Sequence, residues 1–520
     1  MVERTKPINE TIQRNGFLLL NTDAKGKSGS SKSRHTVSSV ILNKLKSAIP
    51  YRPVQITGLL ETELQGVAQS IAEDDTKLYH GTKSSIKDRF NSCNFPPKDQ
   101  KTSAIIVELS PLIFKYAEIP VDTFIDFAVL LYRKVMEIAK SYDRIDVVLD
   151  RYFTDSLKEQ TRDSRGVGTC VLFDDDSEFP RDFRKEFLHN SLNKNDFNEY
   201  LAQKFVTLHN TYQALIVSYR QTALCCNTEP VPSRNIFNCT SEEADQRAVR
   251  HARDAISQGY EFVLVQTIDT DVLVLLISFA GTFGGESISV YAALSSPTGD
   301  VTYYDVKDIA SKIGLDAANA LPFFYAFTGC DTVSSIFNHG KCKCWDVWKN
   351  DERNKDITSV FISLGRLPQT VSEHHVDVLE YYIKRLYSPN AREVSQSLAV
   401  DRLTHFQRST DNDVRKLPMS RPALLEHTRR ACFQAGYLWM ECVRNVTLPD
   451  PTLWGWQRHE GSLIPKWQSD EPSDIGSVLS TCSCKTNICK TCSCAKENLP
   501  CIPGCNCRRS CQNKFNNTQV

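Results

Sequence analysis

The stretch that decides the fold is residues 262–271, which read FVLVQTIDTD. Phe262–Gln266 is short, apolar and rich in β-branched residues, and this pattern predicts a strand. The strand runs directly into Thr267-Ile-Asp-Thr-Asp271, so two carboxylates follow its end. Residues two apart in an extended segment point to the same side. We therefore expect Asp269 and Asp271 to share one metal ion.

Two further strands are expected upstream, and each also ends in an acid. Ser103–Val107 runs into Glu108, and Ile145–Leu149 runs into Asp150. Between them, Val121–Tyr142 carries apolar residues at helical spacing and predicts an amphipathic helix. Strands that alternate with helices over residues 101–345 predict an α/β domain, with a mostly parallel central sheet flanked by helices.

Three more acids lie near expected helix starts. Thr240 and Glu243 form a capping-box pattern that opens a helix closed by Gly259, with Glu243 and Asp245 in its first turn. Asp331 follows a turn of small residues that we expect to begin another helix. In a parallel sheet, ligands bind outside the carboxyl ends of the strands. We therefore expect seven carboxylates to line one crevice.

Seven carboxylates in one crevice repel each other unless cations neutralise them. Mg²⁺ and Mn²⁺ prefer oxygen ligands, and a pair of such ions about 3.5–4 Å apart supports phosphodiester hydrolysis. The expected cofactor is one or two of these ions. The alternative for each acid taken singly is a solvated turn residue or a helix cap.

Four motifs occur in an order that resembles a known nuclease family. They are Val147-Val-Leu-Asp150, Ser241-Glu-Glu-Ala-Asp245, Thr267-Ile-Asp-Thr-Asp271 and Thr328-Gly-Cys-Asp331. They look like the acidic motifs of the XPG-type, flap-endonuclease group within the PIN-like superfamily. The resemblance covers residues 101–345 and implies a metal-dependent endonuclease or exonuclease whose magnesium ligands are Asp150, Glu243, Asp245, Asp269, Asp271 and Asp331.

The same resemblance implies two basic residues and shows two departures. Lys158 and Arg165 would contact the scissile phosphate from one helix face. The chain has Glu108 where the family normally has its first Asp, and Phe337-Asn-His-Gly-Lys341 is a degenerate form of the family's DNA-gripping turn. An alternative interpretation is therefore a catalytically inactive nuclease fold that binds DNA or chromatin.

Composition sets the frame for the rest of the 520 residues. Basic and acidic residues both number 62, so no global charge attracts nucleic acid, and no apolar run is long enough to span a membrane. Residues 1–100 contain a Ser/Lys-rich stretch, Lys25–Ser39, which we interpret as a loop or disordered arm. Gly81-Thr-Lys-Ser84 lacks the glycine spacing of a phosphate loop, and we assign it no function. Residues 346–446 are expected to be mainly helical, with Ala423–Val443 the clearest helix, and 447–480 to be a Pro/Trp-rich connector.

Residues 481–513 form a cysteine-rich module. Nine of the 19 cysteines lie there, at Cys482, Cys484, Cys489, Cys492, Cys494, Cys501, Cys505, Cys507 and Cys511. The segment has too few apolar residues for a core, so cross-links or metal must hold it together. An odd number of thiols argues against simple disulfide pairing. Four-coordinate structural zinc is the better interpretation, with bridging sulfurs that let nine thiolates serve three ions.

The spacing of these cysteines resembles the tesmin-type CXC domain, which implies a three-zinc cluster that binds DNA. From Cys482 onward the net charge is +5, a local basic patch suited to phosphate contacts. Thr491 stands where the family commonly has a Tyr. The alternative is a zinc knot that mediates protein contacts. The whole chain resembles transposon-derived animal proteins, and DNA as the partner implies a nuclear location.

Overall fold

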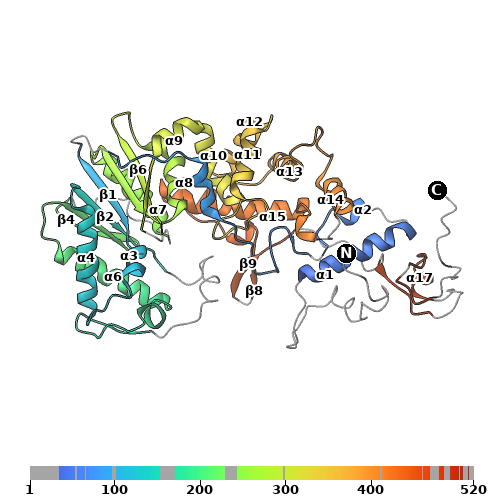
Figure 1. Cartoon of the computed structure of the whole chain (residues 1–520), viewed down its shortest axis with the longest axis horizontal. Helices are drawn as coiled ribbons and strands as arrows, with labels where there is room; N and C mark the ends of the chain where they lie inside the picture. Colours follow the sequence, from blue (N-terminus) through green and yellow to red (C-terminus); the bar gives the residue numbers. More distant parts are fainter. Residues whose placement is uncertain are drawn as a thin grey trace.

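The computed structural model describes residues 34–513 except 53–55, 65, 97–100, 153–169, 229–242, 297–298, 410–412, 460, 469–478, 485–491, 503 and 508–512. The described residues form an elongated molecule (Figure 1). A twisted sheet lies at one end, a helical body lies in the middle, and the cysteine-rich segment lies at the other end, beside helix α1 (Arg34–Ala48).

The main sheet has seven strands in the order β4-β3-β2-β1-β5-β6-β7. Strands β3, β2, β1, β5 and β6 are mutually parallel, and β4 and β7 pair antiparallel at the two edges. The strand bounds are β1 Ser103–Glu108, β2 Arg144–Val148, β3 Ala214–Tyr219, β4 Thr222–Cys226, β5 Phe262–Thr267, β6 Ser289–Ser295 and β7 Val301–Asp305. The prediction of an α/β fold with a mostly parallel sheet is confirmed, and the three predicted strands are β1, β2 and β5.

Helices cover both faces of the sheet because the central strands are apolar on both sides. Along β1, Ile105 and Val107 face one core, and Ala104 and Ile106 face the other. The first core is closed by α3 (Ser110–Tyr116), α4 (Phe124–Ala139) and α6 (Ser191–Leu208). The second is closed by α7 (Ala244–Ser257), α8 (Thr270–Ser278), α9 (Val306–Ile313) and α10 (Leu315–Phe327).

Two of these helices were predicted, and their ends have clear causes. Helix α4 lies inside the predicted range 121–142 and starts at a capping box between Thr123 and Asp126. Helix α7 starts later than predicted: its N-cap residue is Glu243, whereas the capping-box pattern placed the start at Thr240. The Glu243 side chain makes no capping hydrogen bond. Thr240 lies outside the described residues. Gly259, with φ +90°, follows the end of α7 as expected.

The helical body continues the second core of the sheet. It comprises α11 (Lys341–Asn350), α12 (Asn354–Leu364), α13 (Glu373–Tyr387), α14 (Leu398–Arg408) and α15 (Arg421–Cys432). The chain after α15 continues as a π-helical turn and a 3₁₀ turn to Cys442, so the predicted long helix over Ala423–Val443 is present in three successive forms. Helix α10 packs against α12 and α15, so one buried core spans the sheet and the helical body.

Two segments differ from the sequence prediction. Residues 34–39 belong to α1, so this part of the predicted loop over Lys25–Ser39 is wrong. The Pro/Trp-rich segment contains a two-stranded hairpin, β8 (Trp456–His459) and β9 (Ser462–Pro465), and is not irregular throughout. Trp454 and Trp467 are buried in the main core, so this segment is anchored to the helical body.

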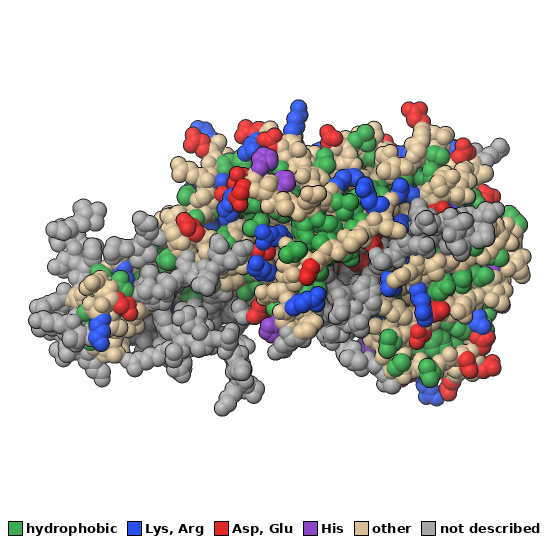
Figure 2. All heavy atoms as spheres, turned by 180° about the vertical axis from the view of Figure 1, so that it is seen from behind, with side chains coloured by type: hydrophobic (Ala, Val, Ile, Leu, Met, Phe, Trp, Pro, Cys, Tyr) green, Lys and Arg blue, Asp and Glu red, His purple; other side chains and the backbone are tan. Residues whose placement is uncertain are grey.

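The remaining described helices are short, and the surface is mixed in charge. The short helices are η3 (Ile49–Tyr51), α2 (Ile56–Leu59), η4 (Lys83–Arg89), η5 (Phe183–Phe187), η8 (Ala280–Thr282), η9 (Val414–Lys416), η12 (Pro451–Leu453) and α17 (Ser493–Lys496). Basic and acidic side chains are both scattered over the face drawn in Figure 2. Among the described helices, none is long and apolar enough to cross a membrane.

Candidate metal centre

The predicted acids lie at the point where the strand order of the sheet changes direction. From β1 the chain adds β2 and β3 on one side, and later adds β5 and β6 on the other. Such a switch point leaves a crevice at the carboxyl ends of the two central strands. Glu108 ends β1, and Asp269 and Asp271 follow β5 directly beside it. The topology therefore places these acids together, as the sequence predicted.

Three aspartates form the centre of the group. Oxygens of Asp245, Asp269 and Asp271 all lie within 4.8 Å of one another. Asp269 is the N-cap residue of α8 and accepts a hydrogen bond from the Asp271 backbone N–H at 2.9 Å. Asp245 lies in the first turn of α7. Helix N-termini favour negative charge, so both helices support carboxylates at this place.

Glu108 and Asp150 lie beside the three aspartates and already have protein partners. The Thr267 hydroxyl donates to Glu108 Oε2 at 2.5 Å. Asp150 Oδ1 accepts the backbone N–H of Ala244 at 2.9 Å, so Asp150 caps α7 from the loop after β2. Its Oδ2 accepts hydroxyl donors from Ser110 at 3.1 Å and from Tyr152 at 3.2 Å. Asp150 thus both joins the acidic group and fixes the start of α7.

Asp331 reaches the group from a loop, not from a helix. The prediction that a helix begins at this turn is wrong, because α11 starts only at Lys341. Gly329 has φ +109°, and a Cβ there would lie 2.7 Å from Ser335 Cα. The loop folds back on itself this tightly only with glycine at that position. This fold-back holds Asp331 over the end of β5.

Lys83, to which we assigned no function from the sequence, lies among three of the acids. Lys83 Nζ is 2.9 Å from Asp269 Oδ2, 3.3 Å from Asp271 Oδ1 and 3.1 Å from Asp331 Oδ1. Lys83 belongs to Gly81-Thr-Lys-Ser84, which matches no phosphate-loop spacing. Only the packing of η4 against the rest of the chain reveals this role, so no local sequence signal marks it.

Tyr325 contacts the acidic group directly, and Lys341 contacts Tyr325. The Tyr325 hydroxyl donates to Asp271 Oδ1 at 2.7 Å. Lys341 Nζ lies 3.8 Å from the centre of the Tyr325 ring and donates to Tyr325 O at 2.6 Å. Burial lowers the pKa of Lys341 to about 8. These two residues were also missed, since neither stands in an acidic motif.

The ionisation of the carboxyl groups reflects first their burial and then their mutual repulsion. Burial, followed by the charge of Asp150, raises the pKa of Glu108 to about 7. Burial and the charge of Asp269 raise the pKa of Asp271 to about 8. The pKa of Asp245 is also raised well above its ordinary value, by burial and then by the charge of Asp269. Without further positive charge, the fold holds part of this group protonated.

For Asp269 and Lys83, in contrast, the neighbouring charges favour the ionised form. Burial alone would raise the pKa of Asp269, but the Lys83 ammonium and the hydrogen bonds from Asp271 together outweigh burial and lower it. Burial likewise opposes the charge on Lys83, but Asp271, Asp269 and Asp331 together raise its pKa. Closely spaced oxygen ligands that stay partly protonated in the absence of cations are suited to Mg²⁺ or Mn²⁺. The three aspartates can therefore hold a divalent ion.

The electrostatic contacts connect all seven predicted acids. Glu243 and Glu108 act on Asp245, and Asp331 acts on Asp271. The side chain of Asp271 is 4% exposed, and that of Asp331 is 41% exposed. The group therefore opens to solvent on the Asp331 side. Lys158 and Arg165, the predicted phosphate contacts, lie outside the described residues.

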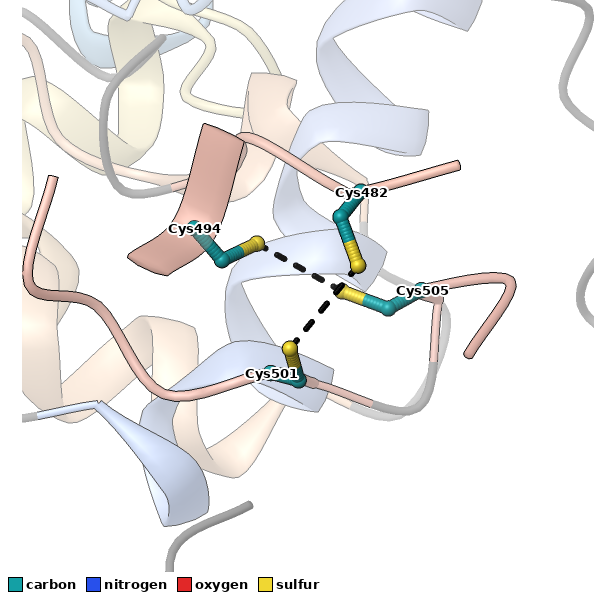
Figure 3. A group of neighbouring side chains, drawn as sticks. All are labelled: Cys482, Cys494, Cys501 and Cys505. Carbon is teal, nitrogen blue, oxygen red and sulfur yellow. Dashed lines mark hydrogen bonds between the residues drawn. The ribbon is translucent and has the colours of Figure 1, made fainter. Parts of the chain in front are cut away.

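The cysteine-rich segment forms a second candidate centre. Sulfur atoms of Cys482, Cys494, Cys501 and Cys505 lie within 4.8 Å of one another, and all four side chains point to a common centre (Figure 3). A second group consists of Cys482, Cys484 and Cys492. Cys482 belongs to both groups, as expected for a bridging thiolate. Cys507 is buried beside them, whereas Cys489 and Cys511 lie outside the described residues.

The sulfur separations fit zinc. Cys482 Sγ lies 3.8 Å from Cys501 Sγ, and Cys494 Sγ lies 3.7 Å from Cys505 Sγ. A tetrahedral zinc with Zn–S bonds of about 2.3 Å places its sulfurs about 3.8 Å apart. A disulfide would need about 2.05 Å. The cluster can therefore bind zinc.

Helix α1 and the following turn hold the cysteine-rich segment. Ile41, Leu42 and Leu45 belong to the same buried cluster as its cysteines. Arg52 donates to Ser480 O at 2.7 Å, to Pro500 O at 3.0 Å and to Cys494 Sγ at 3.4 Å. The N-terminal and C-terminal parts of the described chain thus form one packed unit.

Comparison with known proteins gives only a distant match. No protein-family model matches the chain, and no curated protein matches it. Among solved structures, it is similar to the flap endonuclease of bacteriophage T5, crystallised with metal ions and also as a pseudo-enzyme–product complex with DNA and metal ions. Both matches have a TM-score of 0.29 and 13% identity, and cover 65% of this chain and 96% of the phage protein. At these values the likeness carries no weight for function, which has to be argued from the chain's own residues.

Proposed function

We propose that the protein is a divalent-metal-dependent phosphodiester hydrolase that acts on nucleic acid. The observation that carries this proposal is the gathering of Asp245, Asp269 and Asp271 at the switch point of the sheet, with their oxygens within 4.8 Å. Carboxylate oxygens are ligands suited to hard divalent cations such as Mg²⁺ and Mn²⁺. Four further acids surround the three and add negative charge.

The seven acids divide into two groups in this proposal. Asp245, Asp269 and Asp271 hold the ion directly. Glu108, Asp150, Glu243 and Asp331 complete the anionic cradle, and Lys158 and Arg165 neutralise the substrate phosphate. When bound, the metal lowers the pKa of a coordinated water and offsets charge that develops on the phosphate. The exposed Asp331 side is where the substrate enters, because the opposite side is closed by β1, β5 and Tyr325.

The cysteine-rich segment is proposed to be a zinc module of CXC type that helps to hold DNA. The shared position of Cys482 in two sulfur groups supports a cluster with bridging thiolates. Six of the seven charged residues from Cys482 onward are basic, which gives the segment a field that attracts phosphate. DNA as the partner would place the protein in the nucleus.

A cleavage assay tests the catalytic proposal. Purified protein is incubated with branched DNA, single-stranded DNA and RNA, with Mg²⁺ or Mn²⁺ or with chelator. Cleavage should require the metal and be lost in Asp269→Asn/Asp271→Asn, whereas Glu352→Gln, an exposed acid on the helical body, should cut normally. Binding without cutting in the wild type would instead support the alternative, an inactive nuclease fold that binds DNA through its zinc module.

A further inference from the structure

Lys83 occupies one side of the candidate metal centre. Its ammonium group lies between Asp269, Asp271 and Asp331, at 2.9, 3.3 and 3.1 Å. These three acids come from the end of β5, the first turn of α8 and the loop after α10. Carboxylate oxygens that surround one positive charge are also the ligands that a hard divalent cation takes.

The fold holds Lys83 at this position from both sides. Four residues before Lys83, the backbone carbonyl of Tyr79 accepts the backbone N–H of Ser335 at 2.8 Å. This hydrogen bond joins the segment before η4 to the loop that carries Asp331. After Lys83, Arg89 forms two hydrogen bonds with Asp346 of α11, at 2.9 and 2.6 Å. Ile86, on the same short helix, is fully buried. The lysine is therefore built into the site rather than resting against it.

A metal ion and this ammonium cannot share the same place. Mg²⁺ binds oxygens at about 2.0–2.1 Å, and an ion at the position of the ammonium would need the Asp269 and Asp271 oxygens that now face Lys83. Both cations are positive, so each weakens the binding of the other. Asp245 lies in contact range of Asp269 and Asp271 but has no contact with Lys83 among the described interactions. One ion position thus remains on the Asp245 side.

We propose that Lys83 is the resident counter-cation of the Asp269–Asp271–Asp331 side of the site. The protein then binds one divalent ion, next to Asp245, and takes a second only when the lysine side chain is withdrawn. This inference rests on the proposed function, because it concerns the same metal centre. It makes η4, which lies before the first strand of the sheet, a regulator of how many ions the site holds.

Manganese binding to the full-length, zinc-loaded protein tests the inference. Titration calorimetry and electron paramagnetic resonance would count Mn²⁺ ions in the wild type, in Lys83→Met and in Lys87→Met, an exposed lysine of the same short helix. We expect one ion in the wild type and in Lys87→Met. Lys83→Met should bind two ions, with the first at least about tenfold tighter because a nearby positive charge is gone.

Stability without metal gives a second readout. In chelator, Lys83→Met should melt at a lower temperature than the wild type, and Lys87→Met should not differ. If Lys83→Met does not fold, the double variant Lys83→Met/Asp331→Asn removes one charge of each sign. That variant should fold and bind its single ion more tightly than the wild type, by a smaller factor than that expected for Lys83→Met, because Lys83 contacts Asp269 and Asp271 directly whereas Asp331 does not belong to the Asp245–Asp269–Asp271 group.

The possible results separate the two proposals. Two ions in the wild type, or the same number and affinity in wild type and Lys83→Met, would overturn the role of Lys83 and leave the metal centre standing. A double variant with wild-type affinity would overturn it as well. No ion in any of these proteins would overturn the metal centre itself, and the role of Lys83 with it.

Discussion

The carboxylate centre and the cysteine cluster are both built to bind metal, but they relate to the fold in opposite ways. The acids stand on a seven-stranded sheet with an extensive core, and Lys83 already supplies one positive charge. The cysteines share a small buried cluster with apolar residues of α1, α14, η9 and the neighbouring loops. In the first region the fold positions the ligands, whereas in the second the ligands hold the fold.

The largest expected effect of this difference is the response to metal removal. Structural zinc sites contribute about 10–16 kcal/mol each to folding, so stripping zinc should unfold the cysteine-rich segment. The sheet should stay folded, because its core does not depend on metal. Hydrogen exchange read by mass spectrometry, with and without a strong zinc chelator, would show rapid exchange in the cysteine-rich segment but not in β1 and β5.

Single cysteine variants sharpen the same comparison. Cys482 belongs to both sulfur groups, whereas Cys484 belongs to one. Cys482→Ser should therefore lose more zinc per chain than Cys484→Ser, as measured by elemental analysis. Equal losses would contradict a bridging role for Cys482.

The next effect is the loss of activity in Asp269→Asn/Asp271→Asn. Metal stabilisation of the transition state is worth several kcal/mol, so the rate of cleavage should fall at least about 100-fold. The single substitution Asp271→Asn resembles the protonated form of that carboxyl and leaves Asp269 and Asp331 to pair with Lys83, so in chelator this variant should be no less stable than the wild type. A clear drop in melting temperature would show that the acids are structural, and would break the contrast with the cysteines.

A smaller effect is the pH dependence of stability in the metal-free protein. The pKa of Glu108 is raised to about 7, so between pH 4.5 and 7 the folded state binds a proton that the unfolded state has lost. This contribution is fully present below the unfolded pKa and disappears as the pH rises through about 7. It amounts to about 3 kcal/mol.

Urea unfolding in chelator at pH 5 and pH 8 measures this effect. Wild-type stability should fall between the two values by more than that of Glu108→Gln, which cannot ionise. Divalent metal should reduce the fall, since the ion binds the ionised carboxylates. The same slope in both proteins would contradict the repulsion within the acidic group.

The smallest expected effect concerns Arg52, which joins the two ends of the chain. Its guanidinium donates to two backbone carbonyls and one cysteine sulfur. Arg52→Met should destabilise the docking of the cysteine-rich segment on α1 by about 1–2 kcal/mol. Faster hydrogen exchange in residues 41–48, with unchanged exchange in the main sheet, would show it. Unchanged exchange in both regions would mean that the apolar contacts alone hold the two parts together.

The sequence predicted the parts of the fold that depend on local pattern. Strands β1, β2 and β5 are buried apolar runs, and a parallel sheet brings the residues that follow such runs to one edge. Glu108, Asp150 and Asp269 could therefore be placed together without a structure. The repeated cysteine spacing likewise needs no tertiary information to indicate zinc.

The sequence failed where long-range packing decides. Lys83 reaches the acids because η4 packs on α11, about 250 residues further along the chain, and no neighbouring residue records that contact. The loop at Asp331 looked like a helix start because small residues and an acid are typical of one. Ser335 and Tyr79 instead hold it as a tight turn. No sequence motif marks Tyr325, although its hydroxyl donates a hydrogen bond to Asp271.

The central claim is that the acids at the switch point form one divalent-cation site. Crystals of the full-length protein grown with Mn²⁺ and measured at the manganese absorption edge test it most directly. We predict an anomalous peak bounded by the carboxylates of Asp245, Asp269 and Asp271, with Lys83 still in contact with Asp331. Ordered carboxylates with no anomalous peak between them would contradict the claim.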